Sequence, residues 1–259
     1  MLETLLVETD ARGVALVTLN RPEKHNALSG QMIADLTLLA GELGADQAVR
    51  VVVVTGAGRS FCAGGDLGWM QDQMAAEPDA RAVEAKKLAS MLGAWNGLLK
   101  PVIARVQGAA YGGGVGMMCV CDAAICVEGA SFGLTETKLG LIPATIGPYV
   151  AARLGAQTRE VFMSSARFGA AAALRIGLVA QVVASDALDA AVEASVAPYL
   201  ACAPGAVAEA KAMALALGPQ ITEEQIDATI AALNARWESD EAREGLAAFF
   251  ERRSASWAV

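Results

Sequence analysis

The chain has 259 residues, of which 54% are hydrophobic and only 19% are charged, and its formal net charge is -8. This composition excludes an intrinsically disordered protein, because disorder requires few apolar and many charged residues. The acidic balance argues against nucleic acid or an anionic membrane surface as partner, since both require clustered lysine and arginine. The length accommodates one large domain, or one domain with a smaller appendage.

Cysteine and histidine are too few and too scattered to predict a metal site. His25 is the only histidine, and the cysteines, at positions 62, 119, 121, 126 and 202, form no CxxC pair. We therefore expect no metal, and we expect the cysteines to be small hydrophobic residues in a reducing compartment. The first ten residues do not resemble a signal peptide, and the uncharged stretch Gly108–Cys121 is too short to span a bilayer. The expected location is the cytoplasm.

Short runs of β-branched residues alternate with helical patterns in the first half of the chain. The runs predict buried strands over residues 13–19, 50–55, 101–106 and 123–127. After Ser29, apolar residues recur at helical spacing from Met32 to Leu43, and a second helix is predicted over residues 79–99. Alternation of this kind favours an α/β fold with much parallel strand pairing.

From about Asp186 onward the strand signals stop and the remaining chain is predicted to be helical. Thr222 and Gln225 form a capping box, and apolar residues then follow at 3.6-residue spacing, at Ile226, Ile230, Leu233 and Trp237. These residues exceed what a lone helical tail could hide, so we expect them to pack on the core or on a neighbouring subunit. We divide the chain into a core of residues 1–195 and a helical C-terminal segment of residues 196–259.

Two glycine-rich loops, at residues 60–67 and 108–114, each follow a predicted strand. Glycine lets backbone N–H groups approach a ligand closely, and two converging loops could hold one oxygen as an oxyanion hole. A helix predicted over residues 115–120 would add its N-terminal dipole to that site. The alternative is that these glycines only permit tight turns or helix packing.

Four sequence blocks, in this order and spacing, resemble the crotonase family, the enoyl-CoA hydratase/isomerase superfamily of acyl-CoA enzymes. They are RPEKHNAL (21–28), FCAGGDLGWM (61–70), AYGGGVGMMCVCD (110–122) and FGLTETKLGLIP (132–143). The block at 61–70 is most similar to hydratases of methylglutaconyl-CoA and isohexenylglutaconyl-CoA. The resemblance covers essentially the whole chain. It implies a crotonase-type spiral core of ββα units, with a helical C-terminal oligomerisation segment that builds homotrimers or dimers of trimers.

The resemblance also assigns expected roles to single positions. The backbone N–H groups of Gly65 and Gly113 match the oxyanion hole, and Glu136 matches a catalytic glutamate of the hydratases. The positions expected to bind the substrate are Lys24 near the CoA phosphates, the backbone of Ala63, Gly64 and Asp66 near adenine, and Trp69 and Met70 in the acyl pocket. No cofactor is implied, because coenzyme A arrives as part of the substrate.

One position departs from the family pattern. The second catalytic glutamate of the hydratases would fall at position 116, where this chain has Gly116, so the second-acid position is expected to be vacant. We place hydration of a 2-enoyl-CoA first, because of the block at 61–70. A Δ3,Δ2-enoyl-CoA isomerase that uses Glu136 as its sole base is the alternative, and a catalytically silent acyl-CoA-binding paralogue is a third. Ala144, where dienoyl-CoA isomerases carry aspartate, argues against that subclass.

Each candidate residue also has a purely structural interpretation. Glu136 could cap a helix or be solvated, Trp69 and Met70 could be core, and Lys24 could be a surface charge. The Asp66 side chain is expected to brace its loop by accepting backbone hydrogen bonds. If Glu136 is catalytic, its apolar neighbours are expected to raise its pKa by desolvation; they are Leu134, Leu139 and Ile142.

Overall fold

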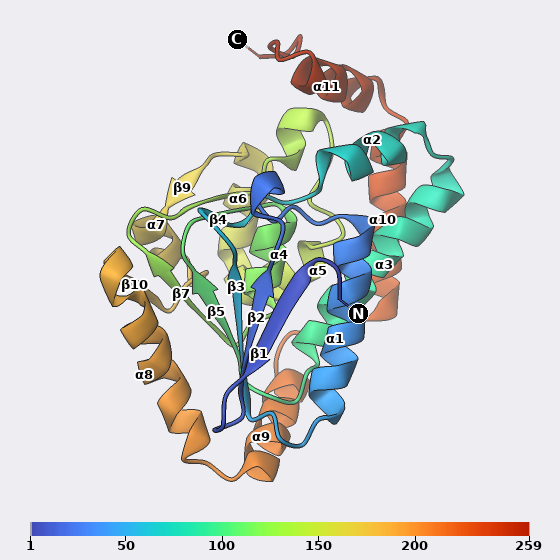
Figure 1. The fold of residues 1–259 in the computed structure, drawn as a ribbon. Helices are drawn as coiled ribbons and strands as arrows, with labels where there is room; N and C mark the ends of the chain where they lie inside the picture. Colours follow the sequence, from blue (N-terminus) through green and yellow to red (C-terminus); the bar gives the residue numbers. More distant parts are fainter. Residues whose placement is uncertain (1, 259) are drawn as a thin grey trace.

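The computed structural model describes residues 2–258 and contains two β-sheets (Figure 1). The larger sheet has six strands in the order β1 (Leu5–Thr9), β2 (Val14–Leu19), β3 (Val51–Gly56), β5 (Val102–Val106), β7 (Ala123–Val127) and β10 (Gln181–Val183). Only β1 is antiparallel to its neighbour. Every residue of β3 is buried, as expected for a parallel strand covered on both faces. The predicted α/β class is therefore confirmed.

The smaller sheet was not visible in the sequence, because its strands are very short. It contains β4 (Ser60–Cys62), β6 (Ala109–Tyr111), β8 (Ser131–Gly133) and β9 (Phe168–Gly169), in that order. The first three are parallel, and β9 is antiparallel to β8. Each of β3, β5 and β7 leads into the next short strand and then into helical structure, which produces a repeated ββα unit.

Eleven α-helices are present in residues 2–258, and four 3-10 helices accompany them. The α-helices are α1 (Gly30–Ala45), α2 (Leu67–Ala75), α3 (Pro78–Asn96), α4 (Gly113–Cys119), α5 (Gly147–Leu154), α6 (Thr158–Ser164), α7 (Ala170–Arg175), α8 (Leu188–Leu200), α9 (Pro204–Leu217), α10 (Glu223–Trp237) and α11 (Asp240–Phe250). The 3-10 helices are η1 (Pro22–Lys24), η2 (Glu136–Leu139), η3 (Gly155–Gln157) and η4 (Ser185–Ala187).

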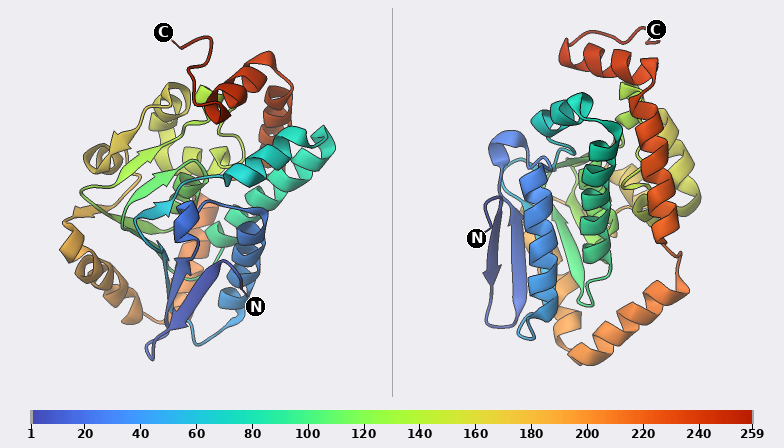
Figure 2. Two further views of the ribbon diagram at one scale, coloured as in Figure 1. Left: turned by 45° about the horizontal axis from the view of Figure 1, so that its top comes forward. Right: turned by 90° about the vertical axis from the view of Figure 1, so that its right-hand side faces the viewer.

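The predicted helix after Ser29 is α1, and it packs along α3 (Figure 2, right). The Ser29 hydroxyl caps α1 by accepting a hydrogen bond of 3.2 Å from the Met32 N–H. Trp95 of α3 is completely buried against this helix, and its indole N–H donates to the Leu36 carbonyl over 3.0 Å. Burying the ring with its polar atom paired stabilises the contact between the two helices.

The C-terminal helices return to the core of the same chain. The predicted capping box of Thr222 and Gln225 is present at the start of α10. Ile226 and Ile230 then pack on Ala85 and Ala89 of α3. Helix α11 packs Ala242 and Leu246 on Leu141, next to η2. The apolar residues of α10 and α11 are thus covered at least partly by their own chain.

Helices α8 and α9 connect the sheet to α10. The expected division between residues 195 and 196 falls inside α8, whose buried residues Leu188, Val192 and Val196 pack over β3, β5 and β7. Within residues 2–258, no single helix is long and apolar enough to cross a membrane. Residues 185–200 and 204–217 reach that length and composition only as a pair, across a bend of 103°.

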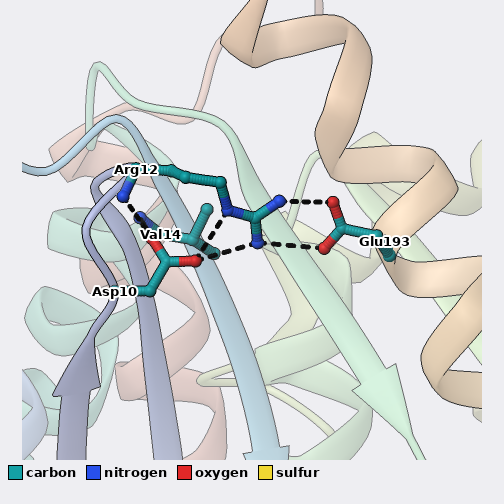
Figure 3. Close-up of polar contacts among 4 residues, drawn as sticks. All are labelled: Asp10, Arg12, Val14 and Glu193. Carbon is teal, nitrogen blue, oxygen red and sulfur yellow. Dashed lines mark hydrogen bonds and ion pairs between the residues drawn. The ribbon is translucent and has the colours of Figure 1, made fainter.

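An exposed ion-pair cluster joins the β1–β2 hairpin to α8 (Figure 3). The Asp10 carboxylate accepts hydrogen bonds from the backbone N–H groups of Arg12 and Val14, over 2.8 and 3.0 Å, and so defines the turn. The Arg12 guanidinium pairs with Asp10 at 2.8 Å and with Glu193 of α8 at 2.5 Å. Because these side chains are about half exposed, solvent screens the pairs and they contribute little to stability.

Candidate active site

The carboxyl ends of the three short parallel strands bring the predicted site residues together. Strands β4 and β8 both pair in parallel with β6, so the segments that follow the three strands leave the small sheet at the same edge. Gly65 follows the end of β4 by three residues, Gly113 follows β6 by two, and Glu136 follows β8 by three. A cavity of about 140 Å³ lies at this edge, and all three residues line it, together with the predicted acyl-pocket residues Trp69 and Met70.

The two glycine-rich loops pack backbone against backbone. A Cβ added to Gly64 would lie 3.0 Å from the Tyr111 carbonyl oxygen and 3.7 Å from the Gly112 Cα, so the approach requires glycine. Gly64 and Gly112 both have positive φ, at 93° and 46°, which L side chains rarely adopt. Among residues 2–258, no protein acceptor pairs with the N–H of Gly65 or of Gly113. Both amides are therefore available to a ligand oxygen.

Glu136 presents an enclosed carboxyl group to the cavity. It is the first residue of η2, and its Oε2 is buried without a hydrogen-bond partner. Desolvation raises the pKa of this carboxyl to about 7, in the direction expected from its apolar neighbours. A Cβ on Gly112 would lie 3.1 Å from the Glu136 Oε1, so the carboxylate rests against the second glycine loop. Among the described residues that line the cavity, Glu136 is the only acid.

Position 116 carries no second acid, and an apolar side chain occupies the space beside it. Gly116 is buried in α4, and a Cβ there would lie 2.7 Å from Cγ2 and 3.1 Å from Cβ of Ile146. Ile146 itself lines the cavity. The space that a second carboxylate would need is therefore occupied by an apolar side chain thirty residues further along the chain, which no local sequence pattern could indicate.

The remaining predicted substrate-binding residues lie outside the cavity wall. Asp66 caps α2, because its side chain accepts hydrogen bonds from the N–H groups of Gly68 and Trp69 over 2.9 and 3.3 Å. It also pairs with Arg21 at 2.9 Å, so the predicted brace of the loop is present. Lys24 is exposed at the end of η1.

Ala63 and Gly64 also lie outside this wall, on the loop that precedes Gly65. The Ala63 N–H donates to the His25 carbonyl over 3.0 Å, which ties this loop to the residues after η1. The predicted contacts of Lys24, Ala63, Gly64 and Asp66 with coenzyme A remain predictions.

Sequence reasoning missed the wall that α3 and α10 contribute. Arg81 of α3 lines the cavity although its side chain is only 6% exposed. Its guanidinium pairs with Glu238, and its Cζ lies 5.8 Å from the ring centroid of Trp237, at the end of α10. An arginine in a helical pattern is normally solvated, and the residues that bury this one follow it by more than 150 positions.

Four cysteines are buried, and the exposed one is Cys202. Burial raises the pKa of Cys62, Cys119 and Cys121 to about 12, so these thiols stay protonated and unreactive near neutral pH. They act as small core residues, as the sequence predicts. Within residues 2–258, no group of three or more His, Cys, Asp or Glu side chains is arranged to hold a metal ion.

Comparison with known proteins gives a consistent assignment. The family described as Enoyl-CoA hydratase/isomerase matches residues 9–259. YngF of Bacillus subtilis, named as an enoyl-CoA hydratase/isomerase, is 33% identical over 263 residues, which cover 98% of this chain and 97% of YngF.

Solved structures agree over the full length. An enoyl-CoA hydratase from Shewanella pealeana has a TM-score of 0.81 at 34% identity, covering 99% of this chain and 97% of that one. An enoyl-CoA hydratase from Mycobacterium avium has a TM-score of 0.87 at 31% identity and covers both chains completely. The predicted crotonase-type fold is thereby confirmed, and acyl-CoA thioesters are the substrates of this fold family. The chain belongs to the enoyl-CoA hydratase/isomerase family, a family of lyases and isomerases.

Proposed function

We propose that this chain hydrates a 2-enoyl-CoA thioester, with Glu136 as its sole proton-transfer group. The observation that carries the proposal is that Gly65, Gly113 and Glu136 line one cavity in which Glu136 is the only acid among the described residues. The names of similar proteins support hydration, since the proteins from Shewanella pealeana and Mycobacterium avium are both named enoyl-CoA hydratases. The block at 61–70 favours the same reaction.

In this proposal, one carboxyl group performs two proton transfers on one face of the substrate. The Glu136 carboxylate removes a proton from water as the water oxygen attacks Cβ, and the electrons of the double bond move onto the thioester oxygen. The N–H groups of Gly65 and Gly113 stabilise that enolate oxygen. Glu136 then returns the proton to Cα, which gives syn addition of water. A pKa of about 7 suits both transfers, because acid and base forms coexist near neutral pH.

Isomerisation of a 3-enoyl-CoA is the second candidate, and one observation favours it. Ile146 fills the position at Gly116 where hydratases of the family place a second glutamate. A single base suffices to move a proton from Cα to Cγ, so the Δ3,Δ2 isomerisation needs no second carboxylate. A third candidate is a silent acyl-CoA binder, although an unpaired, enclosed Glu136 has no structural role that would retain it.

The experiment follows the absorbance of the conjugated thioester. Hydration predicts loss of this absorbance with crotonyl-CoA, and isomerisation predicts its gain with 3-hexenoyl-CoA. Glu136→Gln should abolish either signal, whereas Glu128→Gln, at an exposed acid outside the cavity, should not. If wild-type protein binds both thioesters by calorimetry and changes neither, the silent binder replaces both reactions.

The finer assignments are proposals of the same kind. The block at 61–70 supports a hydratase for methylglutaconyl-CoA or isohexenylglutaconyl-CoA. We further propose a cytoplasmic protein without a cofactor beyond the coenzyme A of its substrate, assembled as a homotrimer or a dimer of trimers. Light scattering coupled to size-exclusion chromatography tests the assembly, since a monomer or dimer mass would contradict it.

A further inference from the structure

Two residues that line the cavity each contain a buried hydrogen-bond donor that has no acceptor within residues 2–258. The indole Nε1 of Trp69, on α2, and the guanidinium Nε of Arg81, on α3, are both enclosed and without a partner among the described residues. Both residues line the cavity that contains Glu136. Folded proteins leave few buried donors unpaired, so each of these requires an explanation. The proton-transfer chemistry proposed above uses neither of them.

The Arg81 side chain is held in place by contacts that leave its Nε unused. Its Nη2 donates to Glu238, which balances its charge, and Trp237 lies against the guanidinium at 5.8 Å. A cation that is buried, paired and packed in this way has a defined orientation. The Nε–H of Arg81 is therefore held in a fixed position without an acceptor in the described part of the chain.

A hydrocarbon chain in this cavity would leave both donors unpaired. The apolar residues that share the wall, such as Leu28, Leu141 and Ile142, suit methylene groups but offer no side-chain acceptor. A site built to donate hydrogen bonds discriminates strongly against an analogue that lacks the matching acceptor. The unpaired donors therefore indicate that the acyl group carries a hydrogen-bond acceptor.

We propose that the acyl group of the substrate carries an oxygen acceptor away from the thioester, and that Arg81 Nε and Trp69 Nε1 bind this oxygen. Arg81 and Trp69 are then the residues that determine specificity for oxygenated over hydrocarbon acyl chains. The inference rests on the proposed function, because it places the acyl chain in the cavity beside Glu136. A carboxylate and a hydroxyl share the required chemistry, and the experiment separates them.

The test measures binding of three unreactive six-carbon thioesters by calorimetry: hexanoyl-CoA, 6-hydroxyhexanoyl-CoA and the mono-CoA thioester of hexanedioic acid. Wild-type protein should bind at least one oxygenated thioester about 10-fold more tightly than hexanoyl-CoA. If only the diacid thioester binds more tightly, the acceptor is a carboxylate. If the hydroxy and diacid thioesters both bind more tightly, a neutral oxygen is enough to accept the hydrogen bonds. Equal or weaker binding of both oxygenated thioesters would overturn the inference.

Matched variants assign the preference to the two donors. Trp69→Phe keeps an aromatic ring without the N–H, and Arg81→Met removes every donor; each should lower the ratio of affinities by about 2-fold to 10-fold. Glu238→Gln keeps the Arg81 Nε and should keep the ratio, which controls for loss of the ion pair. An unchanged ratio in Trp69→Phe, a variant that preserves packing, would overturn the role of Trp69 even if Arg81→Met fails to fold.

Binding and turnover separate the two proposals. A preference for an oxygenated thioester without turnover of any enoyl-CoA would support this inference and contradict the proposed reaction. Turnover of crotonyl-CoA without any binding preference would support the proposed reaction and contradict this inference.

Discussion

Replacing Glu136 by glutamine should abolish turnover and also stabilise the protein above neutral pH. The carboxyl Oε2 is enclosed without a hydrogen-bond partner, and this desolvation raises the pKa to about 7. Glutamine has nearly the same size but carries no charge at any pH. Because the proposed mechanism has no other proton-transfer group, kcat should fall by about 10²-fold to 10⁴-fold.

The size of the stabilisation follows from the two pKa values. A glutamate in the unfolded chain titrates near 4.5, whereas Glu136 in the folded protein titrates at about 7. Below pH 4.5 the carboxyl is neutral in both the folded and the unfolded protein, so its ionisation does not lower the free energy of unfolding. As the pH rises from 4.5 to 7, the unfolded chain ionises first, and the free energy of unfolding falls. At 1.36 kcal/mol per pKa unit, this loss approaches about 3 kcal/mol above pH 7. Glu136→Gln avoids the loss.

Urea unfolding at pH 5 and pH 8 measures this effect. The stability gained by Glu136→Gln should be about 2–3 kcal/mol larger at pH 8 than at pH 5. Glu128→Gln, at an exposed acid after β7, is the matched control and should show no such pH dependence. A gain for Glu136→Gln that is the same at both pH values would refute burial as the cause of the raised pKa.

The same pKa predicts the pH dependence of catalysis. Below pH 7 the base form of Glu136 becomes scarce, so kcat/KM should fall and approach a tenfold decrease per pH unit. Steady-state rates from pH 5 to pH 9 test this, and a profile that stays flat down to pH 5 would exclude Glu136 as the base.

Three glycine substitutions give independent predictions. Gly116→Ala should destabilise the fold by about 1–3 kcal/mol in urea unfolding, because its Cβ would lie 2.7 Å from Ile146, and adding Ile146→Ala should cost less than the sum of the two changes. Gly245→Ala would place a Cβ 2.5 Å from the Leu139 backbone and push α11 away from η2. Because η2 begins with Glu136, both kcat and the free energy of unfolding should fall. Gly41→Ala, exposed within α1 with no atom within 4 Å of the added Cβ, should raise stability by about 0.5–1 kcal/mol in the same assay.

The sequence predicted the larger sheet well because its strands are long enough to show a pattern. The runs at residues 13–19 and 50–55 correspond to β2 and β3 within one residue at each end. Buried parallel strands consist of continuous β-branched residues, so composition alone marks them. The smaller sheet has strands of two or three residues, which are too short to show any periodicity, and β4 and β6 fall in the segments that were interpreted as glycine-rich loops.

The site divides in the same way. Gly65, Gly113 and Glu136 were predicted from motifs that are contiguous in the chain. Arg81 and Ile146 were missed, because their roles depend on contacts with Trp237 and Gly116, which lie far from them in sequence. Burial of an arginine and filling of a glycine position are consequences of tertiary packing, and no local pattern encodes them.

Gly116 and Ile146 are best understood together with the pKa of Glu136. Two carboxylates in one cavity would each disfavour ionisation of the other, and their protons would titrate as a coupled pair. In this chain the second acid is absent and Ile146 occupies its place, so desolvation is the main cause that raises the pKa of Glu136. An apolar wall thus brings a single carboxyl group to a pKa near neutral pH. Glycine in place of an acid at position 116 therefore does not by itself imply lost activity, because a carboxyl group with a pKa near 7 can both donate and accept a proton, as the proposed reaction requires.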